Sequence, residues 1–264
     1  MSIWIKIILK VLFWILVGGI GFNYIMRFIS YSFYKRAKQN GKTEETVQKI
    51  EIGNSLVGYV RSVNFHEKKK TILYFGGSGE IAYNAALSYG KLFNDYIFAC
   101  VDYKGTQESK GRMNLKTMQE SALQLYDYII KQDYVDTSHI VIMGYSYGSG
   151  IATYLASKRK CSKLVLIAGY RDICDLYNKI IPVFFGPIRI FVTDNIDAKT
   201  YATNIQEESL LITSDGDKTI NKKIPQALSK HFKNAIVKEF KGIDHADYWK
   251  HEEVVSYIHE FIDN

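Results

Sequence analysis

Short apolar runs alternate with amphipathic stretches along the chain from about residue 48 to the end. The apolar runs are rich in β-branched residues and lie at 55–60, 71–75, 96–101, 139–143, 163–168, 210–213 and 235–240. Because they are continuous and not alternating, they predict strands that are covered on both faces. Stretches with helical periodicity separate them, at 82–93, 115–132, 149–158, 222–233 and 249–262. Strands alternating with helices predict an α/β fold with a mainly parallel, doubly wound sheet.

One interval, residues 170–208, interrupts this alternation. It contains the segment IIPVFFGPIRI, which carries two of the three prolines of the chain. A long insertion beside such a sheet predicts a small lid over a binding site. An extra pair of helices packing on the core is the alternative.

The N-terminal segment has a different pattern. Residues 11–26 carry no charge, and a mainly apolar stretch extends back to residue 3, interrupted only by Lys6 and Lys10. A helix of about 20 apolar residues spans a bilayer core, and terminal lysines can snorkel to its surface. We therefore expect a single membrane anchor at 1–30, a juxtamembrane linker at 31–47 and one folded domain at 48–264. A cleaved signal peptide and an interfacial amphipathic helix are alternatives, although no A-x-A cleavage site follows the run.

Charge changes this picture only at the N-terminus. The 264 residues carry 34 Lys and Arg against 27 Asp and Glu, a net charge of +7. Residues 1–42 hold seven of the basic residues and no acid, so 43–264 is neutral. The excess therefore indicates a membrane flank and excludes a polyanion-binding body, although basic residues on both sides of the span leave its orientation open. Three cysteines without a CxxC spacing argue against a disulfide scaffold or a zinc ribbon.

The first candidate for chemistry is the segment Gly144-Tyr145-Ser146-Tyr147-Gly148. It directly follows the expected strand 139–143 and precedes the expected helix 149–158. Between a strand and a helix, GxSxG predicts a sharp turn that exposes a serine nucleophile, with Gly144 and Gly148 leaving room for the turn. An ordinary Gly/Ser-rich turn is the alternative. In the nucleophile interpretation, the amide of Tyr147 points toward a developing oxyanion.

A serine nucleophile needs a base and an orienting carboxylate, which follow in the order Ser, Asp/Glu, His in this type of fold. The loop after strand 210–213 offers Asp217, with Asp215 as the second choice and a turn residue by type. Among six histidines, His245 lies on a glycine-containing loop after strand 235–240. We therefore predict Ser146, His245 and Asp217 as the catalytic residues.

The second oxyanion donor is expected on the loop after strand 71–75. This loop reads Gly76-Gly77-Ser78-Gly79-Glu80, and its glycines allow a backbone amide to approach a substrate closely. The Ser78 amide is the predicted donor. A phosphate-binding loop is excluded here because no GK[ST] follows.

These motifs together resemble the α/β-hydrolase-fold serine hydrolases over residues 55–262. The most similar group is that of the membrane-anchored BEM46-like, or α/β-hydrolase domain-containing, proteins. YFGGSGE resembles the group's YFHGNAG, VDYKGTQESKG its VDYRGYGxSxG, GYSYG its nucleophile turn, LLITSDGDKTI its LLIxHGxxDxxV and GIDHAD its GxxHxx. The alignment favours Asp217 over Asp215. The chain departs from the pattern at Gly76, where the family commonly has His, and at Ser214, where it commonly has Gly.

The expected function is that of a serine hydrolase that cleaves a carboxylic ester or thioester through an acyl-enzyme. The membrane segment and the aromatic insertion suggest lipophilic acyl groups, so the expected partners are a small-molecule or lipid acyl substrate and the membrane. No metal, organic cofactor or nucleic acid is expected. A serine peptidase or amidase of the same fold, and a non-catalytic hydrolase-like membrane binding protein, are the alternatives.

Overall fold

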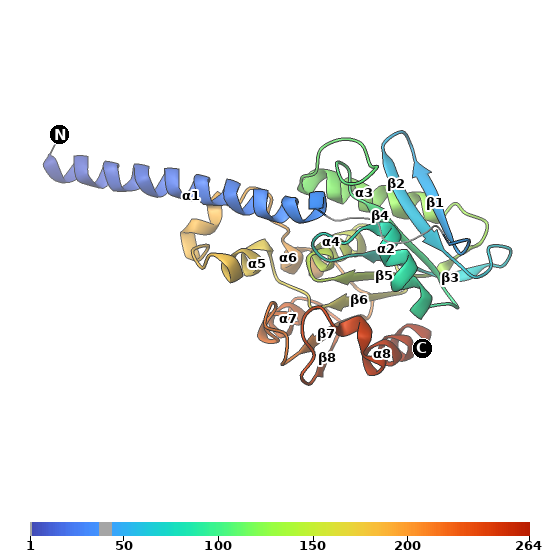
Figure 1. The fold of residues 1–264 in the computed structure, drawn as a ribbon. Coiled ribbons are helices and arrows are strands. Elements are labelled where there is room, and N and C mark those ends of the chain that lie inside the picture. Colours follow the sequence, from blue (N-terminus) through green and yellow to red (C-terminus); the bar gives the residue numbers. More distant parts are fainter. Residues whose placement is uncertain (1, 37–43) are drawn as a thin grey trace.

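The computed structural model describes residues 2–36 and 44–264. Within these residues the strands form one eight-stranded sheet with the order β1-β2-β4-β3-β5-β6-β7-β8. Strands β1 and β2 are antiparallel to their neighbours, and all other pairs are parallel. The predicted α/β class and the mainly parallel sheet are therefore confirmed (Figure 1). The strands are β1 Val47–Ile52, β2 Leu56–Arg61, β3 Lys69–Phe75, β4 Ile97–Asp102, β5 Val135–Tyr145, β6 Lys163–Ile167, β7 Ser209–Ser214 and β8 Ala235–Phe240.

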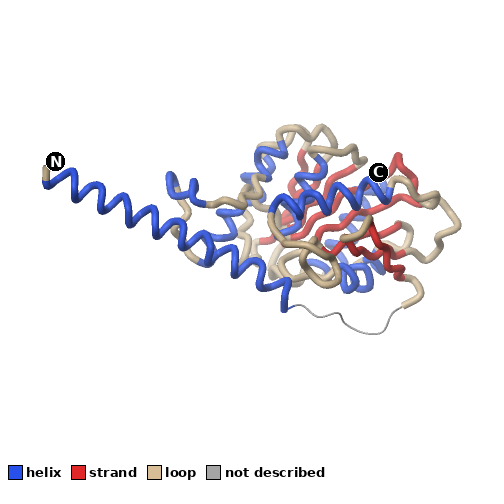
Figure 2. Tube along the Cα trace, turned by 90° about the horizontal axis from the view of Figure 1, so that it is seen from above, coloured by secondary structure: helices blue, strands red, loops and turns tan. Residues whose placement is uncertain are grey.

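Helices cover both faces of this sheet (Figure 2). On one face α3 and α6 pack on α4, and on the other the region of α2 meets the C-terminal region, where Tyr89 stacks on Trp249 and Phe93 stacks on His259. The helices of the body are α2 Ala82–Ser88, α3 Leu115–Ile129, α4 Tyr147–Ala156, α5 Ile173–Ile180, α6 Ala198–Ala202, α7 Lys223–Ser229 and α8 Glu252–Asp263, with 3-10 turns η1 Gly90–Leu92, η2 Gly186–Phe191 and η3 Tyr248–Lys250. Burial on both sides explains the continuous apolar character of the central strands.

Local sequence explains where several elements begin and end. The Asn114 side chain caps α3 by accepting a hydrogen bond from the Thr117 amide at 3.0 Å, and the Thr117 hydroxyl oxygen accepts one from the Asn114 amide. The expected helix 82–93 stops at Ser88 and resumes as η1 at Gly90. Strand β1 was not predicted because its sequence, VQKIEI, mixes charged and apolar residues, as befits an edge strand that is buried only at Val47, Ile50 and Ile52.

The N-terminal helix α1 runs unbroken over Ile3–Arg36. It is long and apolar enough to cross a membrane by length and composition. Residues 31–36, expected as the start of the linker 31–47, continue this helix, and Tyr34 is buried against the body. Residues 37–43 of that expected linker lie outside the described residues.

The interval 170–208 divides into two parts. Its last helix, α6, packs on α4 through the buried Ala198 and Ala202. Its middle, residues 180–191, instead lies beside α1, away from the sheet (Figure 1). We call residues 180–191 the lid segment.

Candidate active site

Ser146 lies at the turn between β5, in the middle of the sheet, and α4. Its backbone has φ 50° and ψ −120°, a left-handed conformation that is rare and costly for a residue with a side chain. The turn is fixed from both sides, because the Ser146 amide donates to the carbonyl of Ile167 on β6 at 2.8 Å and its own carbonyl accepts from Ser149 at 2.9 Å. The strained turn therefore holds the hydroxyl in one place.

Both glycines of the GYSYG motif are required by close packing. A Cβ atom on Gly148 would lie 2.1 Å from the carbonyl oxygen of Phe75, and one on Gly144 would lie 2.6 Å from the Cβ of Ala152. Neither position has space for a side chain, since such approaches are far inside van der Waals contact. The spacing of the motif thus follows from how tightly α4 crosses β3 and β5.

His245 reaches Ser146 from the loop after β8. Its Nε2 lies 2.8 Å from the Ser146 Oγ, and its Nδ1 lies 2.8 Å from the Asp217 Oδ2. The Tyr145 ring stacks on the imidazole with centroids 5.4 Å apart, and its hydroxyl donates to the His245 carbonyl at 2.5 Å. The imidazole is therefore held from its face, its backbone and both of its nitrogens.

Asp217 is buried on the loop after β7, with its carboxylate fully engaged. Oδ1 accepts hydrogen bonds from the amides of Thr219 at 2.9 Å and Ile220 at 2.7 Å. Oδ2 accepts from Tyr248 Oη at 3.1 Å as well as facing His245. These donors fix the Asp217 carboxylate beside Nδ1 of His245; with the ring proton on Nδ1, the arrangement would allow Nε2 to accept the hydroxyl proton of Ser146.

Asp215, the second choice from the sequence, has a different position. It is exposed, and its Oδ1 accepts a hydrogen bond from the Gly242 amide at 2.7 Å. This bond joins the loop after β7, which carries Asp217, to the loop after β8, which carries His245. Ser214 strengthens the same junction, because its Oγ accepts from the amides of Gly216 at 3.0 Å and Ile243 at 2.9 Å. The departure from the family pattern at Ser214 thus supplies an additional connection between the two loops.

Glu80 is a site residue that the sequence analysis missed. Its Oε2 accepts from Tyr74 Oη and from the Gly77 amide, both at 2.9 Å, and its Oε1 accepts from Tyr89 Oη at 3.0 Å. Removal from water raises the pKa of this carboxyl, and the three hydrogen bonds partly oppose that rise. A Cβ on Gly76 would lie 2.3 Å from Oε2, so the departure from His at Gly76 makes room for Glu80. The sequence does place an acidic residue at the end of a glycine-rich loop, and this position could have indicated that Glu80 belongs to the site.

The two predicted oxyanion donors lie on the wall of the pocket that contains Ser146. The amide of Tyr147 belongs to the first turn of α4, where backbone N–H groups have no partner inside the helix. Ser78 is exposed on the opposite loop, next to Gly77, whose own amide is already bound by Glu80. The pocket has a volume of about 350 Å³, and helices α1 and α5 also contribute to its wall. Its lining residues are Ser30, Phe33, Gly77, Ser78, Glu80, Tyr145, Ser146, Tyr147, Leu176, Tyr177, Lys179, Ile180, Thr219 and His245.

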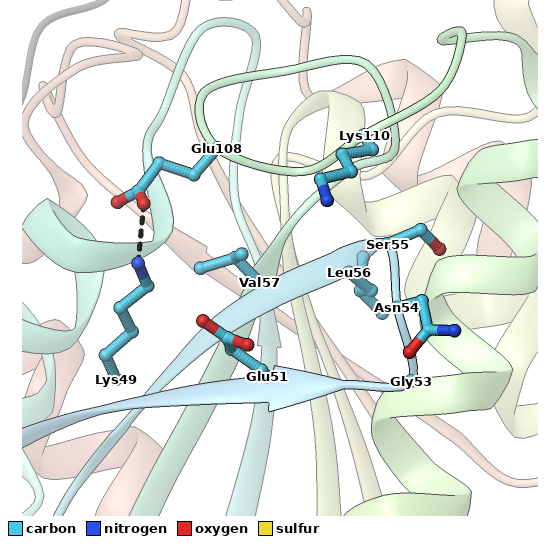
Figure 3. Close-up of a pocket in the computed structure, with 9 residues that line it drawn as sticks. All are labelled: Lys49, Glu51, Gly53, Asn54, Ser55, Leu56, Val57, Glu108 and Lys110. Atoms are coloured by element: carbon cyan, nitrogen blue, oxygen red, sulfur yellow. Dashed lines mark hydrogen bonds and ion pairs between the residues drawn. The ribbon is translucent and has the colours of Figure 1, made fainter.

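A second pocket of about 370 Å³ lies at the β1–β2 hairpin and has a different chemistry (Figure 3). Its charged side chains are two lysines and two glutamates, and Lys49 forms an ion pair with Glu108 at 2.5 Å. No histidine is among its lining residues, so Ser55 has no imidazole partner in this pocket. Within residues 2–36 and 44–264, no three His, Cys, Asp or Glu side chains are grouped as metal ligands.

Comparisons with known proteins agree with this architecture. The family model described as the alpha/beta hydrolase fold matches residues 74–192. Among curated proteins, a multifunctional-autoprocessing repeats-in-toxin of Vibrio vulnificus is 29% identical over 139 residues, which are 48% of this chain and 3% of that protein. The chain therefore spans only a small part of this relative's length.

Two solved structures show how far the similarity of fold extends. An esterase of Pyrococcus furiosus aligns with a TM-score of 0.69 at 14% identity, covering 86% of this chain and 95% of that one. Est1E of Butyrivibrio proteoclasticus, solved with ferulic acid bound, aligns with a TM-score of 0.65 at 16% identity, covering 81% and 96%. The protein thus has the α/β-hydrolase fold, with a long apolar helix at its N-terminus.

Proposed function

We propose that this protein is a serine hydrolase that cleaves a carboxylic ester or thioester, with residues 48–264 as its catalytic domain. The observation that carries the proposal is the hydrogen-bonded line from the Ser146 Oγ through His245 to Asp217, with 2.8 Å at each step. The strained turn at Ser146 supports it, because such strain is kept where function requires it. That esterases share the fold supports the choice of ester chemistry.

In the proposed mechanism, Ser146 Oγ attacks the substrate's carbonyl carbon while its proton passes to His245 Nε2. Asp217 stabilises the resulting imidazolium through Nδ1–H. The carbonyl oxygen becomes an oxyanion that accepts from the amides of Tyr147 and Ser78, and one such donor contributes about 3–4 kcal/mol. The alcohol or thiol then leaves with the proton from Nε2, and an acyl-Ser146 ester remains.

Water completes the cycle. It attacks the acyl carbon as His245 Nε2 takes one of its protons, and the second tetrahedral intermediate collapses by returning that proton to Ser146 Oγ. The carboxylic acid is released and the serine is restored.

The sequence similarities and the N-terminal helix support a place near the membrane-anchored BEM46-like proteins, with α1 as a single-pass anchor.

The test is ester hydrolysis by the full chain, using p-nitrophenyl esters of increasing acyl length. Ser146→Ala should lower kcat at least 10³-fold, because the nucleophile is lost. Ser157→Ala is the matched control: it removes a serine at the opposite end of α4 that only donates to the Tyr154 carbonyl, and activity should be unchanged. Hydrolysis that survives in Ser146→Ala would contradict the proposal. A wild type that cleaves only amides would indicate a peptidase or amidase, and an inert wild type would indicate a binding protein.

A further inference from the structure

Exposed apolar side chains lie on two segments that are far apart in sequence but side by side in space. One is the N-terminal part of α1, where nearly every large apolar side chain from Ile3 to Val17 is exposed. The other is the lid segment, where Phe185 is 59% and Ile190 is 76% exposed. We call residues 3–22 and 180–191 together the apolar wedge (Figure 1).

Close packing joins the two parts of the wedge. A Cβ on Gly19 would lie 2.3 Å from the Phe191 ring, so the lid segment rests directly on the backbone of α1. An apolar cavity of about 220 Å³ remains between them, and residues from both segments form its wall: Trp14, Ile15, Gly18, Gly19, Phe22, Val183, Phe184 and Ile188. The lid therefore reaches as far along α1 as Trp14.

Within the part of the chain that the structure describes, the polar contacts between α1 and the body lie in the C-terminal part of the helix. Arg27 forms an ion pair with Asp194 at 2.9 Å, and Tyr31 Oη donates to the same carboxylate at 2.6 Å. Asn23 and Thr193 exchange two hydrogen bonds, from side chain to side chain at 3.2 Å and from backbone to side chain at 3.4 Å. The helix thus changes at Asn23 from an apolar rod to a part of the folded domain.

These positions set the depth of the lid if α1 spans a bilayer. Arg27 is the first charge after the uncharged run, and Trp14 precedes it by thirteen residues. At 1.5 Å per residue this separation is about 20 Å along the helix axis. Because the hydrocarbon core is about 30 Å thick, a lid that shares a cavity wall with Trp14 lies at the depth of the lipid acyl chains.

Several backbone amides of the lid segment are hydrogen-bonded inside the protein. Backbone groups in lipid must be bonded inside the protein. The amides of Val183 and Phe185 donate to carbonyls within the segment, that of Phe184 donates to the Asn178 side chain, and its two prolines have no N–H. Its one charged residue, Arg189, is paired with the buried Asp172. The segment can therefore meet lipid without an unpaired charge.

We propose that the lid segment inserts into the same lipid leaflet as α1, and that the Ser146 pocket takes the acyl chain of a lipid ester from the bilayer. The pocket supports this source of substrate, since Phe33 of α1 and Ile180 of the lid form part of its wall. The inference rests on the proposed ester hydrolysis and adds the substrate class and the surface that delivers it.

Insertion is tested on the full chain reconstituted in phosphatidylcholine nanodiscs that contain doxyl-labelled lipid. Ile190→Cys carries an environment-sensitive NBD fluorophore, and Val63→Cys, an exposed apolar site on the loop between β2 and β3, is the control. The native thiols compete poorly, because Cys100 and Cys174 are buried and burial raises the pKa of Cys161 to about 12. We expect doxyl lipid to quench the label at 190 and not at 63. Equal quenching at both sites, or cross-linking of Ile190→Cys between two copies, would overturn the insertion.

Delivery of substrate is tested by two assays on one variant, Phe185→Ser with Ile190→Ser. Hydrolysis of a short, water-soluble ester should stay within twofold of wild type, while hydrolysis of a long-chain ester embedded in the bilayer should fall at least tenfold. The paired control, Val63→Ser with Ile236→Ser, replaces exposed residues outside the wedge and should change neither rate. An equal loss on both esters, or no loss on the embedded ester, would contradict the proposal. Absence of any hydrolysis in the wild type would instead defeat the proposed function, and the quenching result would still decide insertion.

Discussion

The Ser146 site and the apolar wedge are built on opposite principles. In the site, the Asp217 carboxylate is withdrawn from water and held by four hydrogen bonds. In the wedge, large apolar side chains are exposed, and within the described residues the hydrogen bonds between α1 and the body lie from Asn23 onward, beyond the wedge. The two regions meet at Ile180 of the lid segment, which lines the Ser146 pocket. We propose that the Ser146 site performs the chemistry and that the apolar wedge determines that the substrate comes from the bilayer.

The largest expected effect comes from the site. Asp217→Asn should lower kcat by about 10⁴-fold, because the amide stabilises the wrong imidazole tautomer while keeping its shape. The loss should be the same for soluble and embedded esters, since it concerns the chemical step in both. Steady-state kinetics with the two substrates measures this.

Asp215→Asn is the matched control for that change. It alters an aspartate two residues away, and its amide oxygen can still accept from the Gly242 amide. Activity should remain within about twofold of wild type, as for an exposed residue away from the reacting atoms. A similar loss in both variants would mean that the loop, and not the Asp217 carboxylate, carries the effect.

A smaller effect is expected from Glu80, at the wall shared by the two regions. Burial raises the pKa of its carboxyl, so the folded protein holds this proton to a higher pH than the unfolded chain does. Between the ordinary pKa of Glu and the raised one, Glu80 therefore makes the free energy of unfolding fall as pH rises, by at most about 1.4 kcal/mol per pH unit for one proton. Below the ordinary pKa this contribution to stability is fully present.

Glu80→Gln should remove that part of the slope while keeping an acceptor for the Gly77 amide. Denaturant unfolding of both proteins across pH 4 to 8 measures the difference, which should move in favour of the variant as pH rises. Parallel curves would show that Glu80 does not titrate in this window.

The variant also tests the oxyanion loop, because an unchanged kcat would mean that the charge of Glu80 has no part in placing Ser78.

The sequence predicted the elements whose signals are local. The central strands appear as continuous apolar runs, and the GYSYG, acidic-loop and histidine-loop segments each follow a strand in the expected order. Strand order then brings Ser146, Asp217 and His245 together, because the carboxyl ends of parallel strands meet at one edge of the sheet.

Long-range contacts could not be predicted in this way. The ion pair of Arg27 with Asp194 joins residues 167 positions apart, and no pattern along the chain indicates it. The apolar run of α1 predicted an anchor, yet its C-terminal part is buried against the body at Met26 and Tyr34 and lines the pocket through Phe33. The composition of this helix predicted a membrane anchor, but it did not indicate which part of the body the helix packs against.

In the proposed mechanism, Ser146 is a nucleophile that His245 activates. The most direct measurement is the intact mass of the protein after reaction with a fluorophosphonate, comparing wild type with Ser146→Ala and Ser157→Ala. We predict one covalent adduct on wild type and on Ser157→Ala, located at Ser146 by peptide mapping, and none on Ser146→Ala. A folded wild type that is not labelled, or an adduct that persists in Ser146→Ala, would show that Ser146 is not the nucleophile.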